Sequence, residues 1–201
     1  MNNALRSASV ADVQGRHWAL TALADIAVRL GRALVADRFI RAALAIEQDA
    51  WLLGAYADFL LEQGRPQEVI ELLRGDTSVD TLLLLLTLAE QQLDAPSRAT
   101  HVELLRDRFA ASRLRNDQRH LREEARFNLH LLDRPRAALQ LARLNWRTQH
   151  EPEDARIFVQ AALATGRPKI AEPILAFLER SGLEDTRLER LTRRVRAAIV
   201  Q

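Results

Sequence analysis

A three-residue pattern recurs along this chain: Gly64-Arg65-Pro66, Asp94-Ala95-Pro96, Asp133-Arg134-Pro135 and Gly166-Arg167-Pro168, with a proline-free version at Gly31-Arg32-Ala33. Gly, or an Asp that tolerates the left-handed conformation, ends one helix, and Pro two residues later has the φ of a first helical turn. Each pattern therefore predicts a corner between two helices. The corners begin at residues 31, 64, 94, 133 and 166, which is close to the period of about 34 residues of two-helix repeats.

The composition favours helices over strands. Hydrophobic residues make up 48% of the 201 residues and aromatic residues only 5%, with Ala and Leu dominant. Such a composition suits closely packed helices and lacks the β-branched and aromatic residues that strands prefer. We therefore predict an all-α fold.

Charge and cysteine content exclude several classes of function. The 29 Lys and Arg nearly balance the 27 Asp and Glu, and the chain has no Cys, which excludes disulfides and thiol chemistry. No stretch approaches the roughly 20 apolar residues of a membrane span. Residues 1–9 lack the basic and apolar parts of an export signal. We expect a soluble chain without cofactor or metal, in a compartment that the sequence does not specify.

Side chains align in columns when each repeat is numbered from its corner. Five positions after the corner the residues are small: Ala36, Val69, Ala99, Ala138 and Ala171. Eight positions after it they are apolar: Phe39, Leu72, Val102, Leu141 and Ile174. Eight positions before it stand Leu23, Tyr56, Leu86, Ala125 and Phe158. Small residues let paired helices approach, and the apolar columns fill the space between them.

The corners predict five antiparallel helix pairs in a single domain over residues 1–201. Their bounds are about 9–47, 50–74, 78–112, 118–148 and 152–181. Ser9 to Asp12 resembles a helix-capping sequence, and Pro173 should kink the last second helix. A final helix over about 185–200 has one apolar side, which suits a cap on the last repeat.

These features resemble the tetratricopeptide repeat family over about residues 15–180. The best unit is Trp51 to Leu73, WLLGAYADFLLEQGRPQEVIELL, in which Tyr56 and Ala57 fit a large and a small family position and Gly64 fits the inter-helix glycine. The chain departs from the family at Arg126 and by an insertion near residues 113–118. The resemblance implies a right-handed α-solenoid whose concave wall is lined by the first helix of each pair.

The resemblance also implies a peptide-binding groove on those first helices. Its candidate residues are Trp18, Asp25, Trp51, Asp58, Leu84, Gln91, Phe127, His130, Arg156 and Gln160. Both tryptophans occupy one column, and Asp25 and Asp58 occupy another, so the first two repeats predict an acidic and aromatic strip. Such a strip favours a partner with Arg or Lys beside an apolar anchor. The alternative is that Trp18 and Trp51 pack between neighbouring repeats.

Other chemistries have less support in the sequence. The family's carboxylate clamp is absent, because the matched positions are Asp25, Asp58, Leu88, Phe127 and Gln160. His120 with Glu124, and Glu123 with His130, share helix faces but lack a third metal ligand. Hydrolytic, P-loop and dinucleotide motifs are missing.

We therefore predict a non-enzymatic protein-binding or peptide-binding scaffold. The alternatives are an anion or nucleic-acid site in the Arg-rich region 106–126 and a purely structural domain of a longer protein.

Overall fold

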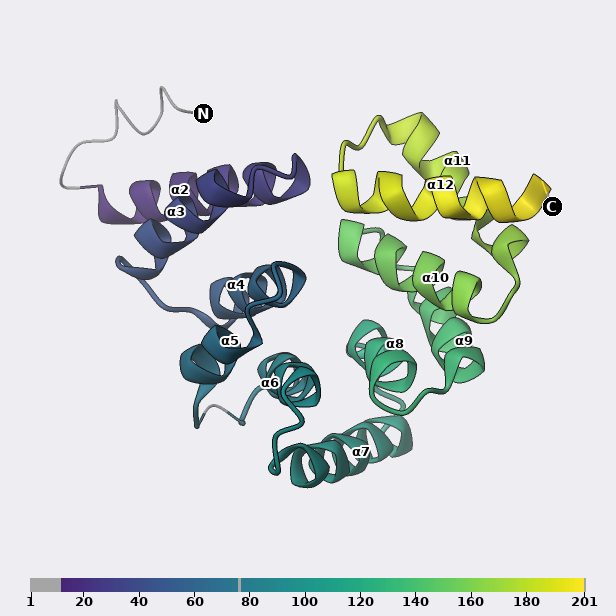
Figure 1. The fold of residues 1–201 in the computed structure, drawn as a ribbon, viewed down its shortest axis with the longest axis horizontal. Helices are drawn as coiled ribbons and strands as arrows, with labels where there is room; N and C mark the ends of the chain where they lie inside the picture. The colour runs from purple at the N-terminus through teal and green to yellow at the C-terminus, as the bar shows by residue number, and fades with distance from the viewer. Residues whose placement is uncertain (1–11, 76, 201) are drawn as a thin grey trace. The chain divides into compact units, whose positions relative to one another are not determined.

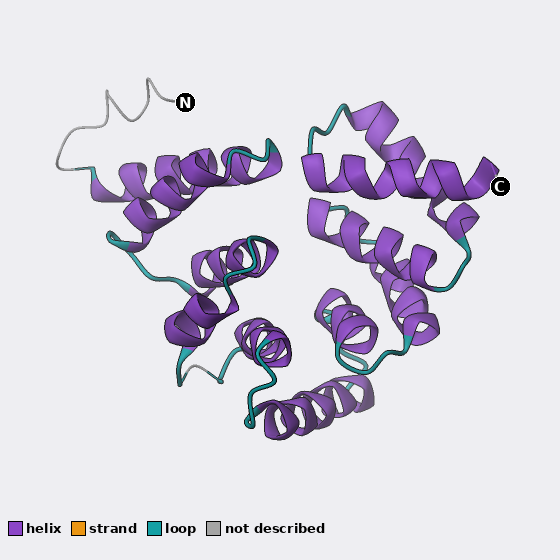
Figure 2. Ribbon diagram, viewed as in Figure 1, coloured by secondary structure: helices purple, strands orange, loops and turns teal. Residues whose placement is uncertain are grey.

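The computed structural model describes residues 12–75 and 77–200, and all of its regular elements are helices (Figures 1 and 2). No strand occurs among these residues, which confirms the all-α prediction. The elements are α2 Val13–Arg29, α3 Ala33–Leu44, α4 Ala50–Glu62, α5 Pro66–Leu73, α6 Asp80–Gln92, α7 Arg98–Leu114, α8 Leu121–His130, α9 Pro135–Asn145, α10 Pro152–Ala164, the 3₁₀ helix η1 Pro168–Ala171, α11 Glu172–Ser181 and α12 Thr186–Val200.

Each predicted pair and the predicted terminal helix correspond to observed helices. The first three residues of the predicted capping sequence, Ser9 to Ala11, lie outside the described residues. Asp12 is the N-cap of α2, and its side chain accepts a hydrogen bond of 2.7 Å from the backbone N–H of Gly15. Such a cap satisfies a donor that the first helical turn leaves without an intrahelical partner.

All five corners place their first residue in the left-handed region. The φ values are 68° at Gly31, 68° at Gly64, 51° at Asp94, 51° at Asp133 and 67° at Gly166. Proline begins the following helix after three of these corners, at Pro66, Pro135 and Pro168. The predicted local mechanism is therefore confirmed: a left-handed residue ends one helix and a proline starts the next.

The corner at Asp94 differs from the others, and the chain divides there. One compact unit ends at Ala95 and the other begins at Pro96, within the third predicted pair. The helix α7 begins only at Arg98, two residues after this proline. The sequence treats residues 1–201 as one array, whereas the structure contains two compact units.

Successive helices pack against one another within each unit. In the first unit, α2 packs on α3, α3 contacts α4, and α4, α5 and α6 pack together (Figure 1). In the second unit, α9 packs against both α8 and α10, and α12 covers α10 and η1. The terminal helix therefore covers the last pair, as its one-sided apolar pattern predicts, and it buries Leu188 and Val195.

The small column lies in the core at four of its five positions. Ala36, Val69, Ala138 and Ala171 are completely buried. Ala99 is exposed, so the prediction for that position is wrong. Because α7 starts two residues later relative to its corner than the other second helices, Ala99 is the second residue of its helix, whereas the other small residues are each the fourth.

The last pair has a broken second helix, as Pro173 predicts. The 3₁₀ turn η1 ends at Ala171, and α11 starts at Glu172, whose backbone N–H binds the carbonyl of Lys169. Pro173 has no N–H with which to continue the α-helical ladder. The kink therefore has a local cause in the sequence.

Candidate functional site

Trp18 and Trp51 are exposed to solvent. Trp18 lies in α2 and Trp51 in the first turn of α4, and 65% and 63% of their respective surfaces are accessible. This exposure contradicts the alternative that the two rings pack between repeats. Exposed tryptophan rings offer a partner a large apolar contact area, because tryptophan buries much apolar surface when it packs.

Polar contacts hold α2 beside the segment that leads into α4. Gln14 donates from Nε2 to Oε2 of Glu47 over 3.3 Å, and Nε2 of His17 lies 4.0 Å from Oδ2 of Asp49. Asp49 is the N-cap of α4 and accepts from the backbone N–H of Leu52 over 2.8 Å. His17, the neighbour of Trp18, thus lies near a cap two residues before Trp51, but its buried Nε2 makes no hydrogen bond. The two tryptophans therefore lie on neighbouring elements of the first unit that these contacts connect, and we group the residues concerned as the tryptophan surface: Gln14, His17, Trp18, Glu47, Asp49 and Trp51.

The predicted pair of acids beside the tryptophans is not formed as an open strip. Asp25 is exposed, but Nε of Arg29 binds it over 3.0 Å, one helical turn away. Asp58 is buried, because the second half of α4 packs into the unit, where α4 contacts α6. The structure instead places Glu47 and Asp49 at the tryptophan surface. Only the capping position of Asp49, just before an apolar run, carried a sequence signal for this role.

Two other expected groove residues belong to the core. Leu84 and Phe127 are almost completely buried, with 1% and 2% of their surfaces accessible. The ring of Phe127 packs on that of Phe109 in α7, with the ring centres 5.3 Å apart. We therefore correct both assignments: these side chains stabilise helix packing and do not line an accessible surface. Their apolar character suited either role, so the column alone did not separate them.

The remaining expected groove residues are at least partly accessible. Gln91 is the second-to-last residue of α6 in the first unit, whereas His130, Arg156 and Gln160 belong to the second unit. Nε2 of His130 lies 3.4 Å from Oε1 of Gln160, which brings side chains of α8 and α10 together although the two residues occupy different columns. These three residues belong to the second unit, whereas the tryptophan surface belongs to the first.

Arginines of the region 106–126 are largely paired with acids. Arg106 binds Glu103 and Arg119 binds Asp117, with shortest distances of 2.5 and 2.6 Å. Arg113 binds Glu124, and Arg122 contacts Glu123 and Asp154. Burial raises the pKa of Glu124, and the charge and hydrogen bond of Arg113 oppose that rise. Pairing of this kind reduces the positive charge that a phosphate backbone would meet.

An ionic cluster connects α3, α4 and α5 in the first unit. Asp37 accepts hydrogen bonds from Tyr56, Arg65 and Arg41 over 3.0, 2.9 and 2.8 Å. Burial alone would raise the pKa of Asp37, but these three hydrogen bonds outweigh it and lower the pKa. Burial and the bond to Asp37 raise the pKa of Tyr56 to about 12. The cluster is fully paired, which indicates a structural role in joining α3, α4 and α5.

A second polar cluster supports α10 in the other unit. The carboxylate of Asp154, which is 2% exposed, accepts from Nδ2 of Asn145 and from the backbone N–H of Glu151, each over 2.8 Å. Arg122 contacts it at 3.5 Å. The side chains of Glu151 and Asp154 together form a capping box. This buried carboxylate is also fully occupied, and its geometry indicates a structural role.

The described residues do not provide a metal centre or a membrane span. Among them, no three His, Asp or Glu side chains gather closely enough to hold a metal ion. Within the same part of the chain, no helix has the length and apolarity needed to cross a bilayer.

In comparisons with known proteins, the chain matches no family model, no curated protein and no solved structure. The tryptophan surface is therefore the best-defined candidate site for binding.

Proposed function

We propose that this protein is a non-catalytic scaffold that binds a segment of another protein on the tryptophan surface of its first unit. The exposure of Trp18 and Trp51 carries this proposal. Tryptophan is enriched among the residues that dominate the energy of protein interfaces, where the ring enters a pocket or covers an apolar anchor. Two exposed rings joined through contacts between α2 and the start of α4 provide such anchors.

The chemistry of the surface favours a partner with a cation beside an apolar side chain. Glu47 and Asp49 lie at the same surface, and 40% of the Asp49 side chain is exposed. Carboxylates at the rim of an interface attract an approaching cation, and Arg or Lys also interacts favourably with a tryptophan face. The proposed partner is therefore a peptide segment with Arg or Lys next to a large apolar residue.

We also propose that the helix pairs form a right-handed, tetratricopeptide-like solenoid. The regular corners and the buried small column support this arrangement. Its test is an experimental structure of the full chain at a resolution that traces both units. A left-handed progression of successive pairs would contradict it.

Selection from a random peptide library tests the binding proposal. Peptides enriched on the full chain should carry Arg or Lys beside an aromatic or branched apolar residue. The double substitution Trp18→Ala/Trp51→Ala should weaken these peptides at least about thirtyfold, since even one anchor residue contributes about 2 kcal/mol or more. Leu34→Ala is the matched control, because Leu34 is 90% exposed in the same unit but lies outside the tryptophan surface.

Kinetics separate the roles of ring and charge in such a complex. Trp51→Ala should mainly speed dissociation, whereas Glu47→Lys should mainly slow association, because rim charges govern encounter and buried anchors govern residence time. Equal binding of the enriched peptides to the wild type and to the double tryptophan variant would contradict the proposal.

A further inference from the structure

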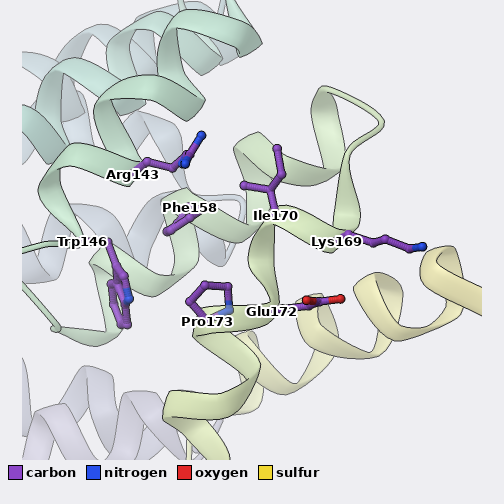
Figure 3. A pocket seen from close by; sticks show the side chains of 7 residues that line it. All are labelled: Arg143, Trp146, Phe158, Lys169, Ile170, Glu172 and Pro173. Carbon is purple, nitrogen blue, oxygen red and sulfur yellow. The ribbon is translucent and has the colours of Figure 1, made fainter.

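An open surface pocket, called the cavity below, lies in the second unit, away from the residues that carry the proposed function. Its volume is about 390 Å³, within the usual range of about 300 to 1,000 Å³ for small-molecule sites. Residues from α9, α10, η1 and α11 line it (Figure 3). All of these elements lie in one compact unit, so the cavity does not depend on the placement of the other unit.

The break in the last pair explains why there is space at this position. An unbroken second helix would continue from Pro168 through Ser181. Because Pro173 lacks the N–H that would bind the carbonyl of Lys169, the chain forms η1 first and restarts as α11. The lining residues Lys169, Ile170, Glu172 and Pro173 all come from this junction. The kink therefore shapes one wall of the cavity.

The opposite wall is aromatic. Trp146, at the C-terminal end of α9, contacts Phe158 and Phe177 edge to face, with ring centres 6.4 and 5.2 Å apart. His150 packs on both Trp146 and Phe177. Phe158 is buried and Trp146 is half-buried. Rings fixed on several sides keep an apolar surface preformed, which lowers the cost of ligand binding.

Two cations and one acid border this apolar space. Arg143 and Lys169 both line the cavity, and no described residue forms an ion pair with either of them. In Figure 3, Arg143 extends beside Phe158 and Ile170, whereas Lys169 and Glu172 point together to the side away from Trp146. Arg143 and Lys169 therefore border the pocket from two different elements, α9 and η1. Most other arginines named above already bind carboxylates.

We propose that the cavity binds a small organic acid with an aromatic or branched apolar body. The body packs against Trp146, Phe158 and Pro173, and the carboxylate pairs with the guanidinium of Arg143. Arginine presents a planar set of donors that matches a carboxylate. Lys169 adds positive charge at the rim, and Glu172 opposes binding of the acid.

Fluorescence of Trp146 provides a direct test with 3-phenylpropionate as the probe. The chain has three tryptophans, so Trp18→Phe/Trp51→Phe leaves Trp146 as the only reporter and removes the anchors of the proposed function. Titration with 3-phenylpropionate should change its emission saturably. The alcohol 3-phenylpropanol, which lacks the charge, should bind about five to ten times more weakly, as expected for the loss of one typical hydrogen bond at an exposed arginine.

Substitutions in the same background test the role of each charge. Arg143→Met should weaken binding about five- to tenfold, and Lys169→Met about two- to threefold, as for an exposed ion pair. Glu172→Gln should tighten binding about twofold, a gain that a misfolded variant would not produce. Arg147→Met is the matched control, because Arg147 is exposed near the same helix end but does not line the cavity.

Several results would overturn this inference. They are the absence of saturable binding at millimolar concentrations, equal binding of the acid and the alcohol, and an equal effect of Arg143→Met and Arg147→Met. N-Acetylphenylalanine, which carries the amide of a peptide end, distinguishes the source of the acid. Binding of 3-phenylpropionate at least as tight as this probe supports a free small acid, whereas a clear preference for N-acetylphenylalanine would replace it with a chain terminus. None of these results depends on peptide binding by the first unit.

Discussion

The two units of this chain use tryptophan in opposite ways. In the first unit, Trp18 and Trp51 lie on first helices of their pairs and about two thirds of each residue is exposed. In the second unit, Trp146 ends a second helix and packs among Phe158, Phe177 and His150. The tryptophans on first helices are therefore exposed, whereas the tryptophan at the end of a second helix is half-buried among other rings.

The polar clusters of the two units also differ in how exposed their central carboxylate is. In the first unit, Asp37 is partly exposed and binds two arginines and a tyrosine across three helices. In the second, Asp154 is buried and binds an amide and a backbone N–H, with one arginine nearby. Surface charge networks are individually weak, whereas a buried carboxylate is costly once its partners are removed. We therefore expect the second unit to be more sensitive to single polar substitutions.

Ala138→Trp should give the largest change in stability. Ala138 is completely buried, and an indole in that column would separate the paired helices α8 and α9. Overpacking typically costs about 1 to 3 kcal/mol, and we expect a loss near or above 3 kcal/mol in the free energy of unfolding. The control is Ala99→Trp at the exposed position of the same column, which should change the thermal midpoint little. Similar losses in both variants would contradict the observed difference between the columns of α7 and α9.

Asp154→Ala should have the next largest effect. The substitution leaves the side chain of Asn145 and the backbone N–H of Glu151 without their acceptor in a buried place. The cost of such unsatisfied groups is about 1 to 3 kcal/mol, and we expect about 2 kcal/mol by chemical denaturation. Asp25→Ala, which removes an exposed pair within one helix, should cost less than about 0.5 kcal/mol. Equal costs would show that burial does not distinguish the two carboxylates.

Tyr56 provides a pH-dependent test of the ionic cluster in the first unit. It is the only tyrosine in the chain, so phenolate absorbance reports on this residue alone. Its pKa should be about 12 in the folded protein and about 10 after unfolding. Because the folded-state pKa is the higher one, the associated stability is complete below about pH 10 and is lost as the pH rises to about 12.

Tyr56→Phe should remove this alkaline dependence and cost about 1 kcal/mol at neutral pH, through loss of the hydrogen bond to Asp37. Asp37 contributes in the opposite direction. Its pKa is lowered in the folded protein, so its stabilisation is present above its unfolded-state pKa and is lost as the pH falls. A phenolate that titrates near pH 10 in the folded chain would contradict the geometry of the cluster.

The smallest expected effects concern the tryptophans themselves. Trp18→Phe/Trp51→Phe should change stability by less than about 0.5 kcal/mol, as is usual for exposed positions. The remaining Trp146 should emit at shorter wavelength and be quenched less by iodide than the two tryptophans of Trp146→Phe. Equal quenching of the two variants would mean that the rings do not differ in exposure.

Local features of the fold could be predicted because each depends on neighbouring residues. Gly or Asp at a corner is selected by a positive φ, and Pro173 breaks a helix wherever it stands in one. These rules placed every described helix pair within a few residues. They could not locate the division at Ala95, because Asp94-Ala95-Pro96 has the same local signature as the other corners, and the difference lies in which helices pack.

The candidate site was predicted only in part for a related reason. The column argument placed Trp18 and Trp51 at equivalent positions, and both are exposed. It also placed Asp58, Leu84 and Phe127 on an open surface, although all three are buried. Helix periodicity specifies which residues share a face, but it does not specify how much of that face the next helix covers.

The sequence by itself determined that this protein is all-helical, where helices end and restart at the five corners, and where the last second helix breaks, since these depend on backbone conformation and on apolar periodicity. Only the tertiary structure decided that Trp18 and Trp51 are exposed, that the acids beside them are Glu47 and Asp49, and that a cavity opens next to Trp146. Exposure and enclosure depend on distances between helices that are far apart in the chain. Those distances follow from the packing of many side chains together.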